Sequence, residues 1–145
     1  MAIYVGPGGA PISSKDRSTV AGIAECARLG LSAMEVEFVR GVKMGAAAAD
    51  EVGKVAKENG IRLSVHAPYY INLLSTKTPI VKASIQRIVD SLDRGERMGA
   101  DAVAVHAAYL GELASEKATE ALKERTSEIL SILEKKGISN VKHKC

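Results

Sequence analysis

The chain has 145 residues, of which 46% are hydrophobic and 26% are charged, and its formal net charge is +3. This length fits one domain with a sizeable core, and so small a positive charge does not by itself indicate a polyanionic partner. Two cysteines and no long apolar run argue against a disulfide scaffold, a signal peptide or a membrane span, so we expect a cytoplasmic protein.

The predicted elements alternate between strands and helices along the whole chain. Strands are expected at Ile3–Val5, Ala33–Val39, Ile61–His66 and Ala102–His106, followed by a strand stub within Ser139–Cys145. Helices are expected at residues 18–29, 46–58 and 115–136. A further helix should begin with Thr78 as its N-cap and Pro79 in the first helical position.

Each predicted helix closes on a glycine shortly before the next strand. The four glycines are Gly30, Gly60, Gly99 and Gly137. Glycine supplies the left-handed backbone that ends a helix, and the spacing between these positions is that of a βαβ unit. The pattern predicts a parallel sheet with right-handed crossovers, in a single domain that covers residues 1–145.

The two faces of the predicted sheet differ in polarity. Histidine, glutamate and small residues share one parity (Glu35, Glu37, Ser64, His66, Ala102, Ala104), and larger apolar residues share the other (Met34, Val36, Phe38, Leu63, Val65, Val103, Val105). A doubly wound sheet needs apolar residues on both faces. A TIM-type (β/α) barrel with helices only on the outside fits better.

Such a barrel would be incomplete. Four βα units and a fifth-strand stub make about half of a closed barrel, which has about 250 residues. Open strand edges would remain exposed. We therefore expect a half-barrel or truncated barrel, present either as a fragment or paired with a missing C-terminal half or a second copy of itself.

His66 and His106 are the main candidate functional residues. Each ends a predicted strand, and neighbouring parallel strands lie about 4.8 Å apart, so both imidazoles could reach one divalent ion such as Zn or Mn. The alternative is that each histidine only hydrogen-bonds within the sheet. His143 lies in the C-terminal stub and receives no role.

Three further residues are candidates on weaker grounds. Glu37 shares the face of the histidines and is a possible metal ligand, or a group that supports one, unless it is simply a solvated charge. Tyr69 and Tyr70 follow His66 in a loop and could stack on a base or sugar, or merely cover the barrel mouth. Arg40 and Lys43 follow the second strand and could hold phosphate oxygens, or lie in a solvated loop.

Two stretches resemble the N-terminal half of endonuclease IV-type AP endonucleases, within the wider xylose isomerase-like TIM barrel group. They are Ser64-Val65-His66-Ala67-Pro68-Tyr69-Tyr70-Ile71-Asn72-Leu73 and Val103-Ala104-Val105-His106. The resemblance implies that His66 and His106 are zinc ligands of an enzyme that cleaves DNA 5′ to abasic sites during base excision repair. It also implies that Tyr69 enters the minor groove of the double-stranded substrate and that Arg40 helps to flip the lesion out.

The resemblance also implies ligands on later strands, beginning with a glutamate on the fifth. Here that position reads Asn140-Val141-Lys142-His143-Lys144-Cys145. We therefore expect only a partial metal site, and whether the 145-residue chain is an enzyme by itself is left open. Two alternatives are a sugar isomerase or epimerase on the same barrel, and a non-catalytic half-barrel that self-associates.

Overall fold

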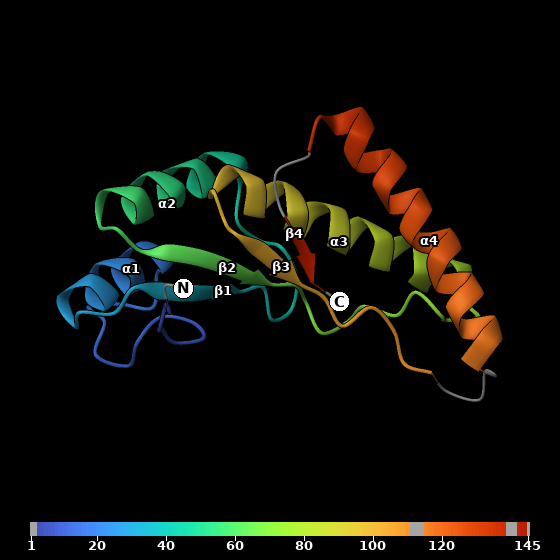
Figure 1. Cartoon of the computed structure of the whole chain (residues 1–145), viewed down its shortest axis with the longest axis horizontal. Helices are drawn as coiled ribbons and strands as arrows, with labels where there is room; N and C mark the ends of the chain where they lie inside the picture. The colour runs from blue at the N-terminus through green and yellow to red at the C-terminus, as the bar shows by residue number, and fades with distance from the viewer. Residues whose placement is uncertain (1–2, 111–114, 139–141, 145) are drawn as a thin grey trace.

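Strands and helices alternate in the computed structural model as the sequence predicts (Figure 1). The structure describes residues 3–110, 115–138 and 142–144, the last of these as backbone only. The helices are α1 (Thr19–Arg28), α2 (Ala46–Glu58), α3 (Thr78–Arg97) and α4 (Ser115–Lys136), and the strands are β1 (Ala33–Glu37), β2 (Arg62–His66), β3 (Ala102–Ala104) and β4 (Lys142–Lys144).

The strands of the described chain form one parallel sheet in the order β1-β2-β3-β4. Consecutive strands are therefore neighbours, and each connection crosses over through a helix, as in a TIM barrel. The predicted partial barrel is confirmed. The register pairs Glu37 with His66 and His66 with Ala104, so these positions share one face of the sheet.

The predicted first strand, Ile3–Val5, is wrong as a regular strand. This segment lies beside β1 and joins it only through scattered hydrogen bonds: the amides of Ala33 and Glu35 donate to the carbonyl oxygens of Val5 and Pro7, at 3.2 and 2.9 Å. Pro7 has no amide hydrogen to donate, which weakens a ladder here. The approach is so close that a Cβ on Gly6 would lie 1.6 Å from the carbonyl oxygen of Ala33.

One face of the sheet is covered by helices and holds the core. α1 packs on β1, α2 on β2, and α3 on β2 and β3, and Figure 1 shows α2 and α3 on the same side of the sheet. The predicted apolar parity is buried there (Met34, Val36, Phe38, Leu63, Val65, Val103). Burial of each large apolar side chain stabilises the fold by about 1.5–3 kcal/mol, so this face fixes the register of the strands.

The helix ends follow the predicted signals with one exception. Gly30, Gly60, Gly99 and Gly137 all have positive φ, between 65° and 72°. Ser18 caps α1, because its hydroxyl accepts a hydrogen bond from the amide of Ala21. Thr78, however, is not an N-cap: α3 begins at Thr78 itself and the cap position is Lys77, which makes no side-chain cap bond. Pro79 lies in the first turn, where no amide hydrogen is needed.

The last helix, α4, is attached differently from the others. Among the described elements it contacts α3 and no strand, chiefly through buried Ile129 and Leu133. Figure 1 shows it leaning away from the sheet.

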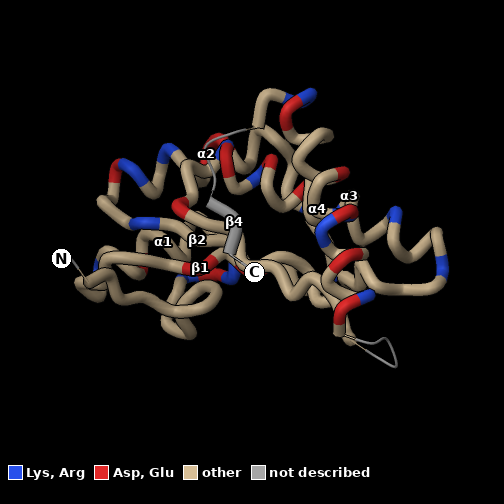
Figure 2. The backbone as a smooth tube through the Cα atoms, turned by 45° about the vertical axis from the view of Figure 1, so that its right-hand side comes forward, with Lys and Arg blue, Asp and Glu red and all other residues tan. Residues whose placement is uncertain are grey.

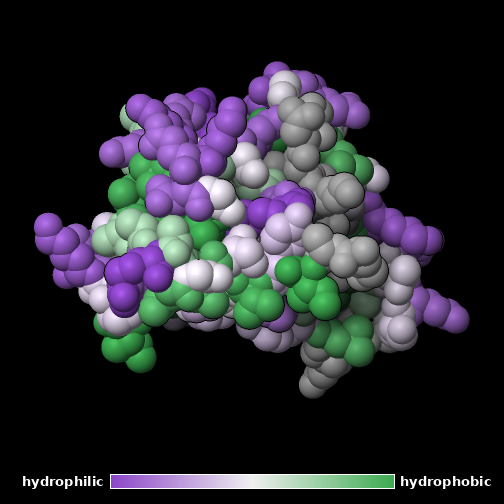
Figure 3. Space-filling model, turned by 60° about the vertical axis from the view of Figure 1, so that its left-hand side comes forward, coloured by the Kyte–Doolittle hydropathy of each residue, from purple (hydrophilic) through white to green (hydrophobic). Residues whose placement is uncertain are grey.

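Charges of both signs are spread over the helices rather than gathered on one (Figure 2). The space-filling view shows hydrophobic side chains in separate patches among hydrophilic ones (Figure 3). None of the described helices is both long and apolar enough to span a membrane.

Candidate metal centre

His66 and His106 are brought together as predicted, although one strand ends earlier than expected. His66 is the last residue of β2, whereas β3 stops at Ala104 and His106 lies two residues beyond it. After Ala104 the chain pairs with the loop that follows β2 instead, because Ala107 accepts a hydrogen bond from the amide of Leu73 at 2.9 Å. Despite this change of pairing partner, both imidazoles lie at the carboxyl end of the sheet.

The two imidazoles face each other through their Nε2 atoms, which are 3.3 Å apart. The ring centroids are 5.1 Å apart and the ring planes are tilted by 45°. His66 Nδ1 lies 2.9 Å from the carbonyl oxygen of Ala67, which only a protonated nitrogen can approach as a donor. This bond places the proton of a neutral His66 on Nδ1 and leaves the Nε2 lone pair directed at His106.

This arrangement fits a divalent metal with two nitrogen ligands. Two nitrogens that each lie 2.0–2.1 Å from a tetrahedral zinc ion are about 3.3–3.4 Å apart, which agrees with the distance found here. Among the described residues no group of three His, Cys, Asp or Glu side chains could hold a metal ion. The structure therefore offers two ligands of a metal site, and the other ligands would have to come from outside the described residues.

Glu37 lies in register with His66, but its carboxylate lies near Gly8 and Gly9, along the edge of β1 that faces away from β2. A Cβ added to Gly8 would be 3.0 Å from Glu37 Oε1, and one added to Gly9 would be 3.6 Å from Oε2. The carboxylate thus lies against the segment that precedes α1. The neighbouring Glu35 accepts a hydrogen bond from the Ser64 hydroxyl at 3.1 Å. These contacts do not bring Glu37 to the histidines.

Of the residues predicted to meet DNA, Tyr69 lies beside the histidine pair and Arg40 lies in an adjoining turn. Tyr69 is 48% exposed, and its ring centroid is 5.7 Å from that of His66. Its amide donates to the carbonyl oxygen of Val39 at 3.4 Å, which joins this loop to the turn that contains Arg40. Arg40 is exposed in that turn. The three strand ends therefore meet at one rim.

Sequence reasoning missed Tyr109, which lies 64% exposed on the same rim. A signal for it is present in the sequence. His66-Ala67-Pro68-Tyr69 and His106-Ala107-Ala108-Tyr109 have a tyrosine at the same distance after each histidine.

The remaining candidates take no part in the pair. His143 is in register with Val103, not with the histidines. Cys26 is a buried free cysteine in α1, and Cys145 lies outside the described residues.

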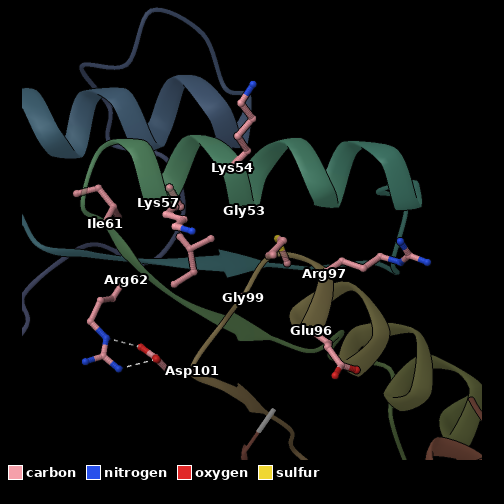
Figure 4. A pocket seen from close by; sticks show the side chains of 12 residues that line it. Gly53, Lys54, Lys57, Ile61, Arg62, Glu96, Arg97, Gly99 and Asp101 are labelled. Atoms are coloured by element: carbon pink, nitrogen blue, oxygen red, sulfur yellow. Dashed lines mark hydrogen bonds and ion pairs between the residues drawn. The ribbon is translucent and has the colours of Figure 1, made fainter. Parts of the chain in front are cut away.

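A cavity of about 510 Å³ lies at the opposite, amino end of the strands (Figure 4). Arg62 and Asp101 line it and form a two-pronged ion pair with N–O distances of 2.7 and 2.5 Å. Gly53 and Met98, from α2 and the end of α3, line it as well. In TIM barrels this end serves stability, whereas chemistry takes place at the carboxyl end. The cavity is therefore not the candidate site.

The chain belongs to the xylose isomerase-like TIM barrel family, which matches residues 23–141. An uncharacterized protein of Methanocaldococcus jannaschii is 34% identical over 134 residues, covering 91% of this chain and 46% of that protein.

Solved structures of two functional kinds share the fold. Endonuclease IV from Thermus thermophilus superposes with a TM-score of 0.65 at 21% identity, over 87% of this chain and 46% of that one. D-psicose 3-epimerase from Clostridium cellulolyticum gives 0.66 at 20% identity, over 94% and 50%. A D-tagatose 3-epimerase-like protein gives 0.64 at 22% identity, over 94% and 51%.

The chain thus spans about half the length of the proteins it matches. At such low sequence identity the structural matches establish the fold alone. They do not separate a nuclease from a sugar epimerase.

Proposed function

We propose that this chain provides one half of the active site of a metal-dependent phosphodiesterase of the endonuclease IV type, which cleaves DNA 5′ to abasic sites. The single observation that carries the proposal is the meeting of His66 and His106 at 3.3 Å through Nε2, with Tyr69 next to them. Zinc is the ion that this pair would hold, with manganese as the alternative.

In this proposal each residue of the rim has a distinct task. His66 and His106 donate two lone pairs, and the Ala67 carbonyl keeps the His66 ring in the tautomer and orientation that this requires. Tyr69 presents an exposed ring for the minor groove, and Arg40 provides a positive charge near the phosphates. When bound, the metal supplies a Lewis acid and an activated water for phosphodiester hydrolysis.

The proposal needs a further half, because two histidines do not complete a hydrolytic centre. A closed barrel would place additional ligands opposite this sheet face, and it would also cover the strand edges left open here. The partner would be a C-terminal half-barrel or a second copy of this chain.

The test combines metal binding with cleavage of a defined substrate. Titration with Co(II), a spectroscopic substitute for zinc, should give the absorption bands of a nitrogen-ligated ion, and these should vanish in the variant His66→Ala. Incubation with zinc and a duplex that contains one abasic site should nick the strand 5′ to the lesion if two copies complete the site. An absence of both metal binding and nicking would contradict the proposal.

A sugar isomerase or epimerase is the second candidate, favoured by a different cavity. Glu35 and Glu37 line a space of about 360 Å³ together with Arg17, which is within the size range of small-molecule pockets. Two carboxylates in one cavity can exchange protons with a ketose. Incubation with D-psicose or D-tagatose, followed by chromatography of the sugars, should then show interconversion, and it should not depend on His106.

A further inference from the structure

The loop after β3 places an exposed aromatic side chain beside the histidine pair. Tyr109 is 64% exposed, and its hydroxyl donates to the carbonyl oxygen of Tyr69 at 3.5 Å. The contact anchors the tyrosine to the neighbouring loop while most of the ring remains open to solvent. The same loop continues with Leu110, which is 53% exposed.

A second aromatic ring and a cation extend this surface. Tyr70 is 63% exposed, and its carbonyl oxygen accepts a hydrogen bond from Arg87 Nη1 at 3.0 Å. Arg87 comes from α3, and no carboxylate of the described residues lies within ion-pair distance of it. We call Tyr69, Tyr70, Tyr109 and Arg87 the aromatic rim.

The chemistry of the aromatic rim suits an unpaired nucleotide. A nucleobase has a flat π face that stacks on an exposed tyrosine ring, and stacking of this kind tolerates any base. A guanidinium whose charge is not neutralised by a carboxylate can donate to a phosphate oxygen.

The spacing between histidine and tyrosine in the sequence also indicates that both loops contribute a tyrosine to this surface. A tyrosine follows each histidine by three residues, at 66 and 69 and again at 106 and 109. Because the two histidines face each other, the two tyrosines lie on adjacent loops at the same end of the sheet. The rim is therefore built from both loops and not from the loop of Tyr69 alone.

We propose that Tyr109 and Arg87 bind an unpaired nucleotide of a DNA strand, with its base stacked on Tyr109 and a phosphate on Arg87. The inference rests on the proposed function, because that nucleotide would belong to the strand that the histidine pair acts on. It adds two residues to which no role was assigned above.

The experiment measures binding without metal or cleavage. Fluorescence anisotropy of a labelled single-stranded oligodeoxynucleotide, with EDTA present, compares the unmodified chain with Tyr109→Ala. Loss of one stacked base should weaken binding about tenfold. Tyr109→Phe keeps the ring and should bind like the unmodified chain. Arg87→Gln should weaken binding and lower the slope of affinity against salt by about one phosphate contact.

Tyr4→Ala is the matched control, because Tyr4 is a similarly exposed tyrosine whose ring lies 4.4 Å from Arg62, at the amino end of β2. It should leave binding unchanged. Equal binding by the unmodified chain and Tyr109→Ala, or an equal loss in Tyr4→Ala, would overturn the inference. Because EDTA removes the metal, this binding result does not depend on whether the chain cleaves DNA. If the unmodified chain nicks the abasic duplex but Tyr109→Ala binds the oligonucleotide equally well, the nuclease proposal stands and this inference alone is wrong.

Discussion

The two ends of the strands differ in how their polar groups are satisfied. At the amino end, Arg62 and Asp101 pair through two hydrogen bonds and Arg62 also lies over the ring of Tyr4. At the carboxyl end, His66 and His106 turn their Nε2 atoms toward each other, and tyrosines remain exposed. The ion pair at the amino end contributes to stability. The two nitrogen atoms directed at a common point make the carboxyl end suited to binding.

The largest expected effect is the loss of metal affinity in His106→Ala. Removing even a group that supports a ligand commonly costs 10–100-fold in affinity, so loss of the ligand itself should reach about 100-fold. A Co(II) or zinc titration measures it. His143→Ala serves as the control because its backbone is in register with Val103 and not with either histidine. An equal loss in both variants would place the metal elsewhere.

At the amino end, Gly53→Ala should lower stability without affecting metal binding. A Cβ at this position of α2 would lie 2.9 Å from the carbonyl oxygens of Arg97 and Met98, which are backbone atoms that cannot rotate away. The free energy of unfolding should fall by about 1–3 kcal/mol, measured by urea denaturation. Gly45→Ala is the matched variant, since a Cβ there meets nothing within 4 Å. Similar losses in both would show that α2 and α3 do not pack as described.

A third prediction concerns pH and the last turn of α1, which leads into the amino end of β1. Hydrogen bonds from Arg28 and then Ser13 lower the pKa of Glu25 to about 2. A lowered pKa means that the charged form stabilises the fold above the unfolded value of about 4.3, and that this contribution is lost as pH falls toward 2. The unmodified chain should therefore have a larger free energy of unfolding than Glu25→Gln at pH 4.5. This difference should decrease as the pH is lowered to about 2 in a series of denaturation measurements. A constant difference across this range would contradict the assignment.

The smallest expected effects are those on the exposed ion pairs, beginning with Arg62→Ala. Its ion pair with Asp101 is about half exposed on both sides, so water and salt screen it. The thermal unfolding midpoint should fall slightly, and by less at high salt than at low salt. Lys54→Ala, which removes a longer and more exposed contact with Glu58, should change it even less. A large loss of metal affinity in Arg62→Ala would contradict the assignment of stability to the amino end and of binding to the carboxyl end.

Much of the fold could be predicted from local sequence patterns, because tertiary packing does not change them. Glycines at four helix ends and the two parities of the strands predict the parallel sheet and its buried face, because backbone conformation and side-chain alternation are properties of short segments. The local signals failed at Ile3–Val5, where a proline and glycines keep an extended segment from forming a regular strand, and at Thr78, where the helix began one residue early.

For the site, too, some features could be predicted from the sequence and others depended on the tertiary structure. The sequence alone determined the residue types at the strand ends, and hence that His66 and His106 share a face, because the period of a strand is two residues. Only the tertiary structure decided that the Nε2 atoms meet at 3.3 Å, that Glu37 lies against Gly8 and Gly9, and that Tyr109 joins Tyr69. These facts depend on rotamers and on contacts between loops about 40 residues apart, which no local pattern specifies.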